Sequence, residues 1–226
     1  MIPHTPQADH FIERMRASLQ ADMPQAATRT VAKHAHVYTC GEHDAMVYVI
    51  VSGHVKLLVL SPDSKQCLLA IYAAGDVFGE LCLAEGSGRR ETATAMTDTV
   101  VKQIPCAQFL LRLSRDALLE GFVRYLAVRI ADQQRVIASL VTVDSEQRLA
   151  QTLLHLAHQL GQPDPRSIRI VQRISHAELA EMVGTTRPRV SHFMKHFRAL
   201  GLIELTREHQ LIIKEQRLTA YVAAGR

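Results

Sequence analysis

The first half of the chain alternates short apolar runs with turn-forming residues. Four such runs span residues 47–51, 55–60, 67–71 and 99–104. Turn residues flank them, in Ser52-Gly53, Ser61-Pro62-Asp63, Gly75-Asp76 and Thr97-Asp98. Runs of this length, rich in Val, Leu and Ile and without a 3.6-residue period, predict strands. Strands so short and closely spaced predict an antiparallel barrel or sandwich between about residues 37 and 104.

Helical periodicity begins near Ser114. From there a seam of positions recurs at alternating intervals of four and three residues, namely Leu119, Val123, Leu126, Ile130, Gln133, Ile137 and Leu140. This 3.5-residue repeat is typical of a coiled coil and predicts a helix of about 30 residues over 114–143. A second copy of the chain is the simplest partner for the seam, so we expect a homodimer. The alternative is that the seam packs against the chain's own β domain.

Capping residues predict where the later helices begin and end. Asp144 is a good N-cap for a helix over 145–160, which Gly161 would end, and a loop over 162–165 follows. Ser175-His176-Ala177-Glu178 is a capping box that opens a short helix through Val183.

A second short helix follows the first after a tight turn. Gly184 ends the first helix, Thr185-Thr186 begins the next with Pro188 in its first turn, and Gly201 stops it. Two short strands, 202–205 and 211–214, then flank residues 206–209 as a wing. This order predicts a winged helix-turn-helix, whose second helix enters the major groove of DNA.

Candidate DNA-binding residues lie at the turn and along the second helix. Arginine pairs with guanine through two hydrogen bonds, whereas threonine hydroxyls and lysine ammonium groups suit phosphates. The candidates are Thr185, Thr186, Arg187, Pro188, Arg189, Ser191, His192 and Lys195. A charged helix is more often just a solvated face, but here the charges directly follow a capped helix, a turn and a second N-cap.

Charge and composition agree with a nucleic-acid partner. Residues 166–226 hold 11 Lys/Arg against 5 Asp/Glu, whereas the first 165 residues hold 15 against 17. A basic C-terminal part indicates contact with a polyanion. Apolar residues make up 47 % of the chain, yet no run reaches the eighteen or so needed to span a bilayer, and the N-terminus lacks a secretory pattern. We therefore expect a cytoplasmic protein.

Several other function classes find little support. The four cysteines, at 40, 67, 82 and 106, lack the spacing of a zinc or iron–sulfur site, so we expect separate thiols and no metal. Nothing resembles a Ser/His/Asp, paired-carboxylate or metal-ligand pattern, so we do not expect an enzyme.

With these residues in place, the chain resembles the CRP/FNR family of bacterial transcription regulators. The resemblance runs from about Tyr38 to the wing. It rests on Gly41 and on the segments 48–56, 75–83, 148–154 and 183–191, which follow the family's order.

The resemblance implies an α+β fold. Residues 1–113 would form an effector-binding, jelly-roll-like antiparallel β-roll with a short N-terminal helix. Residues 114–143 would form the dimerisation helix, and residues 144–226 the winged helix-turn-helix. The implied function is sequence-specific DNA binding under the control of a small effector, with RNA polymerase as a further partner. The alternative is a cyclic-nucleotide-responsive module whose basic C-terminal domain binds protein and not DNA.

The family's base contacts fall here on Arg187, Pro188 and His192. Arg187 suits guanine, Pro188 replaces a carboxylate, and His192 replaces a second arginine. We therefore expect a two-fold symmetric operator that differs from the family's best-known consensus.

The resemblance also implies an effector pocket. In cyclic-nucleotide-binding members a glutamate holds the ribose and an arginine ten residues later holds the phosphate, here Glu80 and Arg90, with Arg89 as a second cation. Glu91 stands where a small hydroxyl is expected, so either Thr92 takes that place or the phosphate site is compromised. The implied pocket comprises Gly79, Glu80, Leu81, Cys82, Arg89, Arg90, Glu91, Thr92, Gln133 and Gln134.

Gln133 and Gln134 fall where cyclic-AMP-binding members carry Thr and Ser to read the base. Gln133 could instead set the register of the seam. Cyclic AMP, cyclic GMP, cyclic di-GMP, another effector and no ligand all stay open. We expect an effector to act through these glutamines on a hinge around Val143-Asp144.

Overall fold

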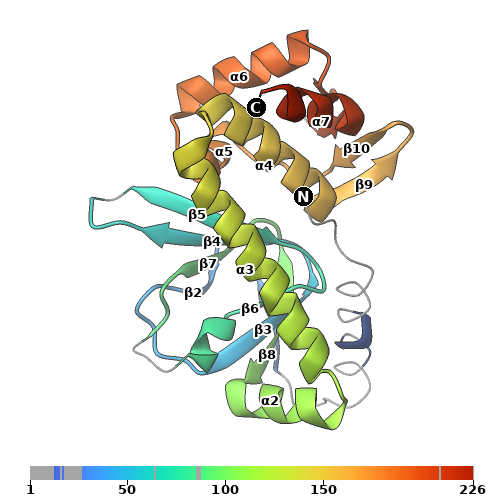
Figure 1. Ribbon diagram of the computed structural model, residues 1–226. Coiled ribbons are helices and arrows are strands. Elements are labelled where there is room, and N and C mark those ends of the chain that lie inside the picture. Colours follow the sequence, from blue (N-terminus) through green and yellow to red (C-terminus); the bar gives the residue numbers. More distant parts are fainter. Residues whose placement is uncertain are drawn as a thin grey trace. The chain divides into compact units, whose positions relative to one another are not determined.

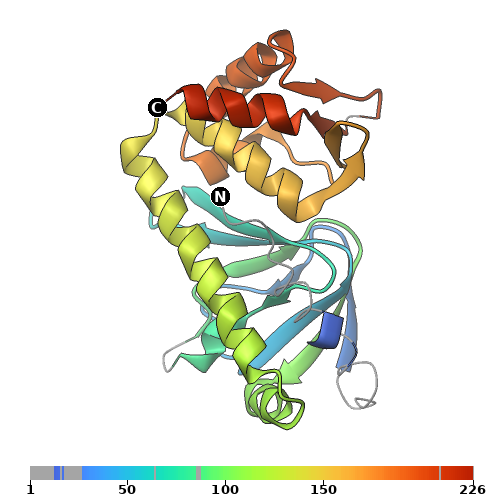
Figure 2. The same cartoon turned by 45° about the vertical axis from the view of Figure 1, so that its right-hand side comes forward.

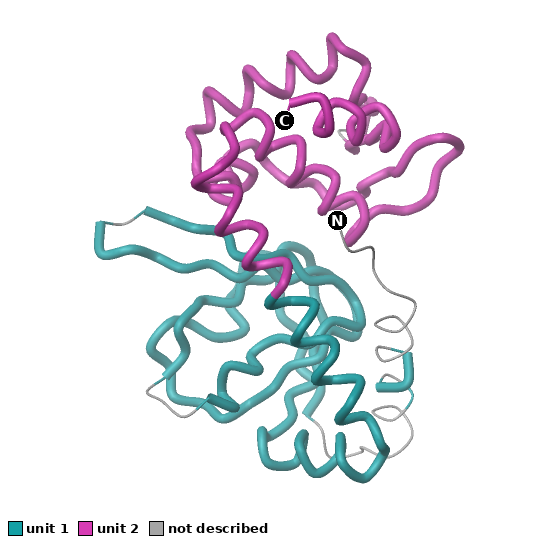
Figure 3. The backbone as a smooth tube through the Cα atoms, in the orientation of Figure 1, with its two compact units in different colours: residues 1–130 teal, residues 131–226 magenta. Residues whose placement is uncertain are grey.

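The computed structural model describes residues 13–15, 17, 27–63, 65–84, 88–208 and 210–225. The chain divides into two compact units, residues 1–130 and 131–226, and the division falls inside helix α3 (Leu119–Thr142) (Figure 3). The segment 114–143, which the sequence sets apart as a dimerisation helix, is thus shared between them. The expected N-terminal helix falls mostly outside the described residues.

The first unit contains two four-stranded antiparallel sheets, which confirms the predicted β-roll (Figure 1). One sheet has the order β1 (Ala27–Val31), β8 (Thr99–Pro105), β3 (Met46–Ser52) and β6 (Val77–Phe78). The other has the order β2 (His36–Tyr38), β7 (Thr92–Ala95), β4 (Val55–Leu60) and β5 (Gln66–Tyr72). A single 3₁₀ turn, η1 (Glu80–Leu83), follows β6.

Aromatic rings fill the core between these sheets. Tyr38, Tyr48, Tyr72 and Phe78 are buried together, and the Tyr48 and Phe78 ring centroids lie 5.2 Å apart in a stacked arrangement. Each such aromatic pair contributes about 1 kcal/mol beyond the burial of its area. The core thereby presents two tyrosine hydroxyls, from Tyr38 and Tyr48, to charged groups described below.

Two helices cover one face of the first sheet. Phe109 and Leu113 from α2 (Cys106–Arg115) and Phe122 and Tyr125 from α3 join the core cluster of that face. The sequence predicts one helix of about 30 residues from 114, and this is wrong, because α3 has 24 residues and starts later. The chain turns at Ala117 (φ 51°), which allows Leu113 and Leu118 to be buried together.

The second unit contains the end of α3, four further helices and a small sheet. The helices are α4 (Ser145–Leu160), α5 (His176–Val183), α6 (Arg187–Ala199) and α7 (Glu215–Ala224). The sheet has the order β11 (Ile203–Leu205), β12 (Leu211–Ile213), β10 (Ser167–Ile170) and β9 (Gly161–Asp164). Helix α7 lies alongside α4 in both views (Figures 1 and 2).

The capping predictions in this unit are confirmed. Asp144 Oδ1 accepts hydrogen bonds from Glu146 N at 2.8 Å and Gln147 N at 3.0 Å. Ser175 and Glu178 form both bonds of the capping box, and Gly184 ends α5 in the left-handed region with φ 69°. The predicted loop over 162–165 is wrong, because residues 161–164 and 167–170 pair as the hairpin β9–β10, whose turn is at residues 165–166.

Asp144→Ala removes both N-cap hydrogen bonds of α4. We expect the free energy of unfolding to fall by about 1 kcal/mol, the usual effect of losing such a cap. Asp144→Asn, which retains a side-chain acceptor, should recover most of this difference. Urea denaturation monitored by circular dichroism measures it, and equal midpoints for the two variants would contradict the role of the cap.

Candidate functional site

Helices α5 and α6 cross through a tight turn that small apolar groups hold together. Ala180, Val183 and Val190 are buried there, as expected for a helix-turn-helix. Thr185 N donates to Ala180 O at 3.1 Å, and Gly184 takes the left-handed conformation that glycine adopts without strain. Thr186 is the N-cap of α6, so the backbone fixes where α6 starts.

One face of α6 is exposed and basic. The structure leaves most of the candidate DNA-binding side chains open to solvent, namely Thr186, Arg187, Pro188, Arg189, His192 and Lys195. Thr185 and Ser191 are half-buried, and Ser191 Oγ lies 2.8 Å from His176 Nδ1. Burial lowers the pKa of His176, and the nearby charge of Arg187 lowers it further. Ser191 thus ties α6 to α5.

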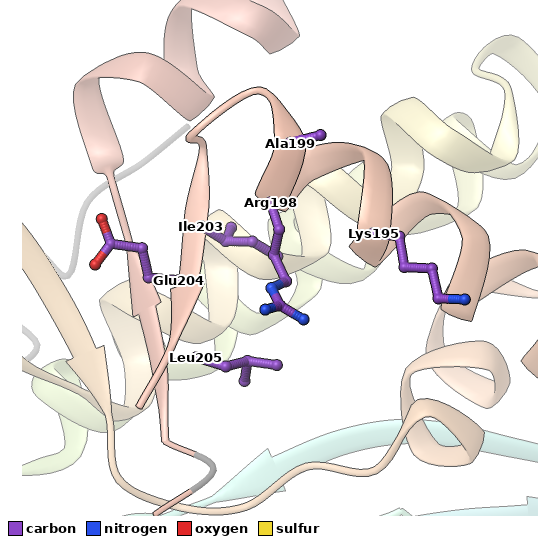
Figure 4. A pocket seen from close by; sticks show the side chains of 6 residues that line it. All are labelled: Lys195, Arg198, Ala199, Ile203, Glu204 and Leu205. Atoms are coloured by element: carbon purple, nitrogen blue, oxygen red, sulfur yellow. The ribbon is translucent and has the colours of Figure 1, made fainter. Parts of the chain in front are cut away.

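A groove of about 510 Å³ runs beside α6. Six residues line it, namely Lys195, Arg198, Ala199, Ile203, Glu204 and Leu205 (Figure 4). Glu204 is paired with Lys214 at 3.0 Å, so the charge that remains in the groove is that of Lys195 and Arg198. Arg198 was not predicted from the sequence, although its spacing of three residues from Lys195 places both on one helix face.

The C-terminal half of α6 is anchored to α4 and α7. Glu146 Oε1 accepts hydrogen bonds from His196 Nδ1 at 2.6 Å and from the Tyr221 hydroxyl at 3.0 Å. Burial and then the Glu146 carboxylate raise the pKa of Tyr221 to about 12. His158 and Glu215 form a second link between α4 and α7 at 2.7 Å. The unpredicted helix α7 therefore helps to fix the recognition helix.

Arg148 connects the ends of two helices. Its Nε donates to Val183 O at 3.0 Å, at the end of α5. Its Nη1 donates to the last-turn carbonyls of α3, at 3.3 Å from Ser139 O and 3.4 Å from Leu140 O, and to Val143 O. One guanidinium thus donates to carbonyl groups at the ends of both helices, where most of the last carbonyls have no backbone donor.

The seam of α3 is mostly exposed. Within the single chain, five of its residues have 45–64 % of their surface open, namely Leu119, Val123, Ile130, Ile137 and Leu140. Leu126 packs against the core of the first unit. An exposed apolar stripe of this length is typical of an interface rather than of a solvated face.

Inside the first unit, Glu80 is paired with a buried arginine of α3. Arg129 Nη2 lies 2.9 Å from Glu80 Oε1, and Arg129 also donates to Val77 O at 3.2 Å and to the Tyr72 hydroxyl. Burial lowers the pKa of Arg129, but Tyr72, Tyr125 and Glu80 raise it by more. Arg129 was not predicted from the sequence. The signal that could have identified it is its charge, directly before Ile130 of the apolar seam.

The neighbouring arginine that faces the interior is Arg89, not Arg90. Arg89 is 95 % buried, whereas Arg90 is exposed, so the inward pair Glu80 and Arg89 is nine residues apart. Arg89 Nη1 donates to Gly79 O at 2.7 Å, and Nη2 donates to Met46 O at 2.6 Å and to Asp44 Oδ1. A Cβ at Gly79 would lie 2.9 Å from Arg89 Nη1, so this close approach requires glycine.

The other expected pocket residues are divided between the interior and the surface. Glu91 is buried and accepts a hydrogen bond from the Tyr38 hydroxyl at 2.8 Å. Thr92 Oγ1 accepts one from Cys40 N at 3.1 Å. Leu81 is exposed, Cys82 is half-buried, and Gln133 and Gln134 are exposed on the part of α3 that belongs to the second unit.

Neither a membrane-spanning helix nor a metal-binding cluster is present among the described residues. Among them, no helix is both long and apolar enough to cross a membrane. They also contain no group of three or more His, Cys, Asp or Glu side chains placed to hold a metal ion.

Family models match both units of the chain. The cyclic nucleotide-binding domain model matches residues 28–116, and the Crp-like helix-turn-helix domain model matches residues 147–221. A CRP-like cAMP-activated global transcriptional regulator from Mycobacterium tuberculosis is 31 % identical over 185 residues, which cover 80 % of this chain and 82 % of that protein. The chain belongs to the CRP/FNR family.

Other members of the CRP/FNR family are similar over most of their length. The global nitrogen regulator of Synechococcus elongatus is 30 % identical over 173 residues, which cover 75 % of this chain and 78 % of the relative. The structure of a CooA mutant from Carboxydothermus hydrogenoformans has a TM-score of 0.74 at 26 % identity and covers 90 % of this chain and 93 % of that one. The present chain is thus a transcription regulator of the CRP/FNR family with a DNA-binding helix-turn-helix. The alternative, in which its C-terminal domain binds protein and not DNA, is not favoured.

Proposed function

We propose that the protein binds a two-fold symmetric operator as a homodimer, with one α6 helix of each protomer in the major groove. The exposed basic face of α6 carries this proposal, because it follows a capped and well-packed helix-turn-helix. Two-fold symmetry would place the two recognition helices in successive major grooves about 34 Å apart. The exposed seam of α3 is the surface through which the two protomers would associate.

Base recognition would rest on the N-terminal half of α6. Arg187 is exposed in the first turn and can donate two hydrogen bonds to a guanine. Pro188 has no polar side chain there, and His192 offers fewer donors than an arginine. The operator should therefore differ from the family's best-known consensus. Selection of binding sites from random DNA tests this, and recovery of that consensus, or of sites without symmetry, would contradict it.

The groove beside α6 would hold the sugar–phosphate backbone. Lys195 and Arg198 provide its positive charge, since Glu204 is paired with Lys214. Phosphate contacts position a protein on DNA without reading its sequence. RNA polymerase would be a further partner of the DNA-bound protein. The protein would lie in the cytoplasm with its DNA, and it would act by binding and not by catalysis.

Arg187→Ala should weaken binding to the selected operator by a factor of roughly 5 to 150, the usual range for losing one bidentate base contact. Lys195→Ala should instead weaken binding to all sequences and lower the slope of log K against log salt by about 1. Fluorescence anisotropy with labelled duplexes at several salt concentrations measures both effects.

Lys65→Ala is the matched control for both variants, because it removes an exposed positive charge from the first unit. It should leave operator affinity unchanged. DNA affinity that does not depend on salt, or an Arg187→Ala variant with wild-type affinity and specificity, would contradict the proposed function.

A further inference from the structure

The interior of the first unit is crowded with its own charges. Two guanidinium groups, Arg89 and Arg129, lie among three carboxylates, Asp44, Glu80 and Glu91. All five groups are at least half-buried. The negative charges therefore outnumber the positive ones before any ligand enters.

Arg89 has its terminal nitrogens occupied by the chain itself. Nη1 donates to Gly79 O, and Nη2 is shared by Met46 O and the Asp44 carboxylate. The Arg89 Cζ atom also lies 4.2 Å from the Tyr38 ring centroid, so the ring covers one face of the guanidinium. The terminal donors of a guanidinium are those that normally bind a phosphate, and here three of the four terminal N–H groups are already engaged.

Asp44 is held firmly in its position on Arg89. Its Oδ2 accepts a hydrogen bond from the Tyr48 hydroxyl at 3.0 Å, and its Oδ1 accepts one from Met46 N at 3.3 Å. The Asp44 side chain is 26 % exposed, whereas the Arg89 side chain is 3 % exposed. Solvent, or an approaching ligand, thus meets the negative member of this ion pair.

A second carboxylate lies on the Tyr38 side of Arg89. Glu91 is 98 % buried and binds the hydroxyl of Tyr38, the tyrosine whose ring contacts Arg89. Burial and then the Glu91 charge raise the pKa of Tyr38, so its hydroxyl stays protonated and keeps donating to Glu91. Within the described residues, Arg89 Nε and Glu80 Oε2 are the buried polar atoms of this cluster that have no partner. An anion at Nε would lie beside the Asp44 carboxylate on the same guanidinium.

We propose that Asp44 is a built-in anion that occupies Arg89, and that the β-roll of this protein consequently does not take up nucleoside 3′,5′-cyclic monophosphates. The fold implies such a ligand, but its phosphate needs a guanidinium that is not already paired, and Arg89 does not meet this requirement. Arg129 does not replace Arg89, because it is paired with Glu80. This inference goes beyond the proposed function, because it concerns the ligand of the first unit and not DNA binding by the second.

Calorimetric titration of the full-length protein with cyclic AMP and cyclic GMP tests the inference directly. The wild-type protein should show no saturable binding up to about 1 mM of either nucleotide, which corresponds to about −4 kcal/mol. Saturable binding with a micromolar Kd would overturn the proposal.

Asp44→Asn removes the competing charge and keeps the shape of the side chain. It should gain saturable binding to at least one of the two nucleotides, with a Kd at least tenfold below the wild-type limit. Asp44→Glu keeps the charge and should show no saturable binding of either nucleotide. Glu42→Gln is the matched control, because it neutralises an exposed carboxylate two residues away from Asp44. It should also show no saturable binding.

Two further outcomes have defined meanings. Binding by neither wild type nor a folded Asp44→Asn, with folding checked by thermal melting, would overturn Asp44 as the occupant. If Asp44→Asn does not fold, Asp44→Ser provides the same test with a smaller neutral acceptor. DNA binding is measured on the same preparations. Its absence would count against the proposed function and not against the occupation of Arg89 by Asp44.

Discussion

Ile137→Glu is expected to convert the protein from a dimer into a monomer of 25.2 kDa. Ile137 lies in the middle of the C-terminal half of the seam, and 64 % of its surface is exposed in the single chain. In the proposed dimer this position meets the partner's seam, so the substitution would bury two unpaired negative charges close to each other. Burying an ion without a partner costs several kcal/mol.

The expected size of this effect follows from that cost. About 3 kcal/mol raises the dimer dissociation constant by more than 100-fold. Sedimentation equilibrium at micromolar protein concentration measures the change in mass. Operator affinity should fall at the same time, because a monomer can contact only one half of a symmetric site.

Ala138→Glu is the control on the same helix. Ala138 is also exposed, but it follows Ile137 by one residue. It therefore lies about 100° around the helix axis from Ile137, outside the seam. This variant should remain a dimer. A dimeric Ile137→Glu variant, or equal dissociation of both variants, would show that the protomers do not associate through this seam.

Arg148→Met should lower the free energy of unfolding by about 3 kcal/mol. The methionine retains an apolar stem of similar length but loses every hydrogen bond to the ends of α3 and α5. A half-buried carbonyl left without a donor costs about 1–3 kcal/mol, and a hydrogen bond from a charged donor is stronger than a neutral one. For a chain of this size the melting temperature should fall by roughly 6–12 °C.

Arg148→Lys separates charge from geometry. Lysine keeps the positive charge near both helix C-termini, but its single ammonium group cannot span Val183 O and the carbonyls of α3 together. We expect the melting temperature of Arg148→Lys to lie between those of wild type and Arg148→Met. Hydrogen exchange should show faster exchange at the last turn of α3 in both variants. A melting temperature within one degree or so of wild type for Arg148→Met would contradict this role of the guanidinium.

The helix boundaries of the second unit could be predicted because they depend on local chemistry. Asp144, Ser175 and Gly184 act on backbone groups within a few residues, so their effect is visible in the sequence. The hairpin β9–β10 and helix α7 were not predicted. Pro163 and Pro165 suggest a loop, and the N-cap residue of α7 is Lys214, which makes no side-chain capping hydrogen bond.

The placement of the pocket residues shows a different limit. Which of two adjacent arginines faces inward depends on the path of the chain into β7, and spacing from Glu80 favoured Arg90 over Arg89. The partner that fixes Arg89 is Asp44, which is 45 residues away in sequence. No local pattern connects the two, because only the packing of β3 and the segment before β7 brings them together.

The Asp44–Arg89 contact can also be regarded as a competition between an attached ligand and a dissolved one. A carboxylate tethered to the same folded chain acts at an effective concentration of millimolar or more, and a rigid fold holds it in place at no further entropic cost. A metabolite whose anion binds Arg89 no more tightly than a free carboxylate would have to exceed that concentration to replace it. The occupancy of Arg89 is therefore fixed when the chain folds, and it does not follow the changing supply of small anions in the cell.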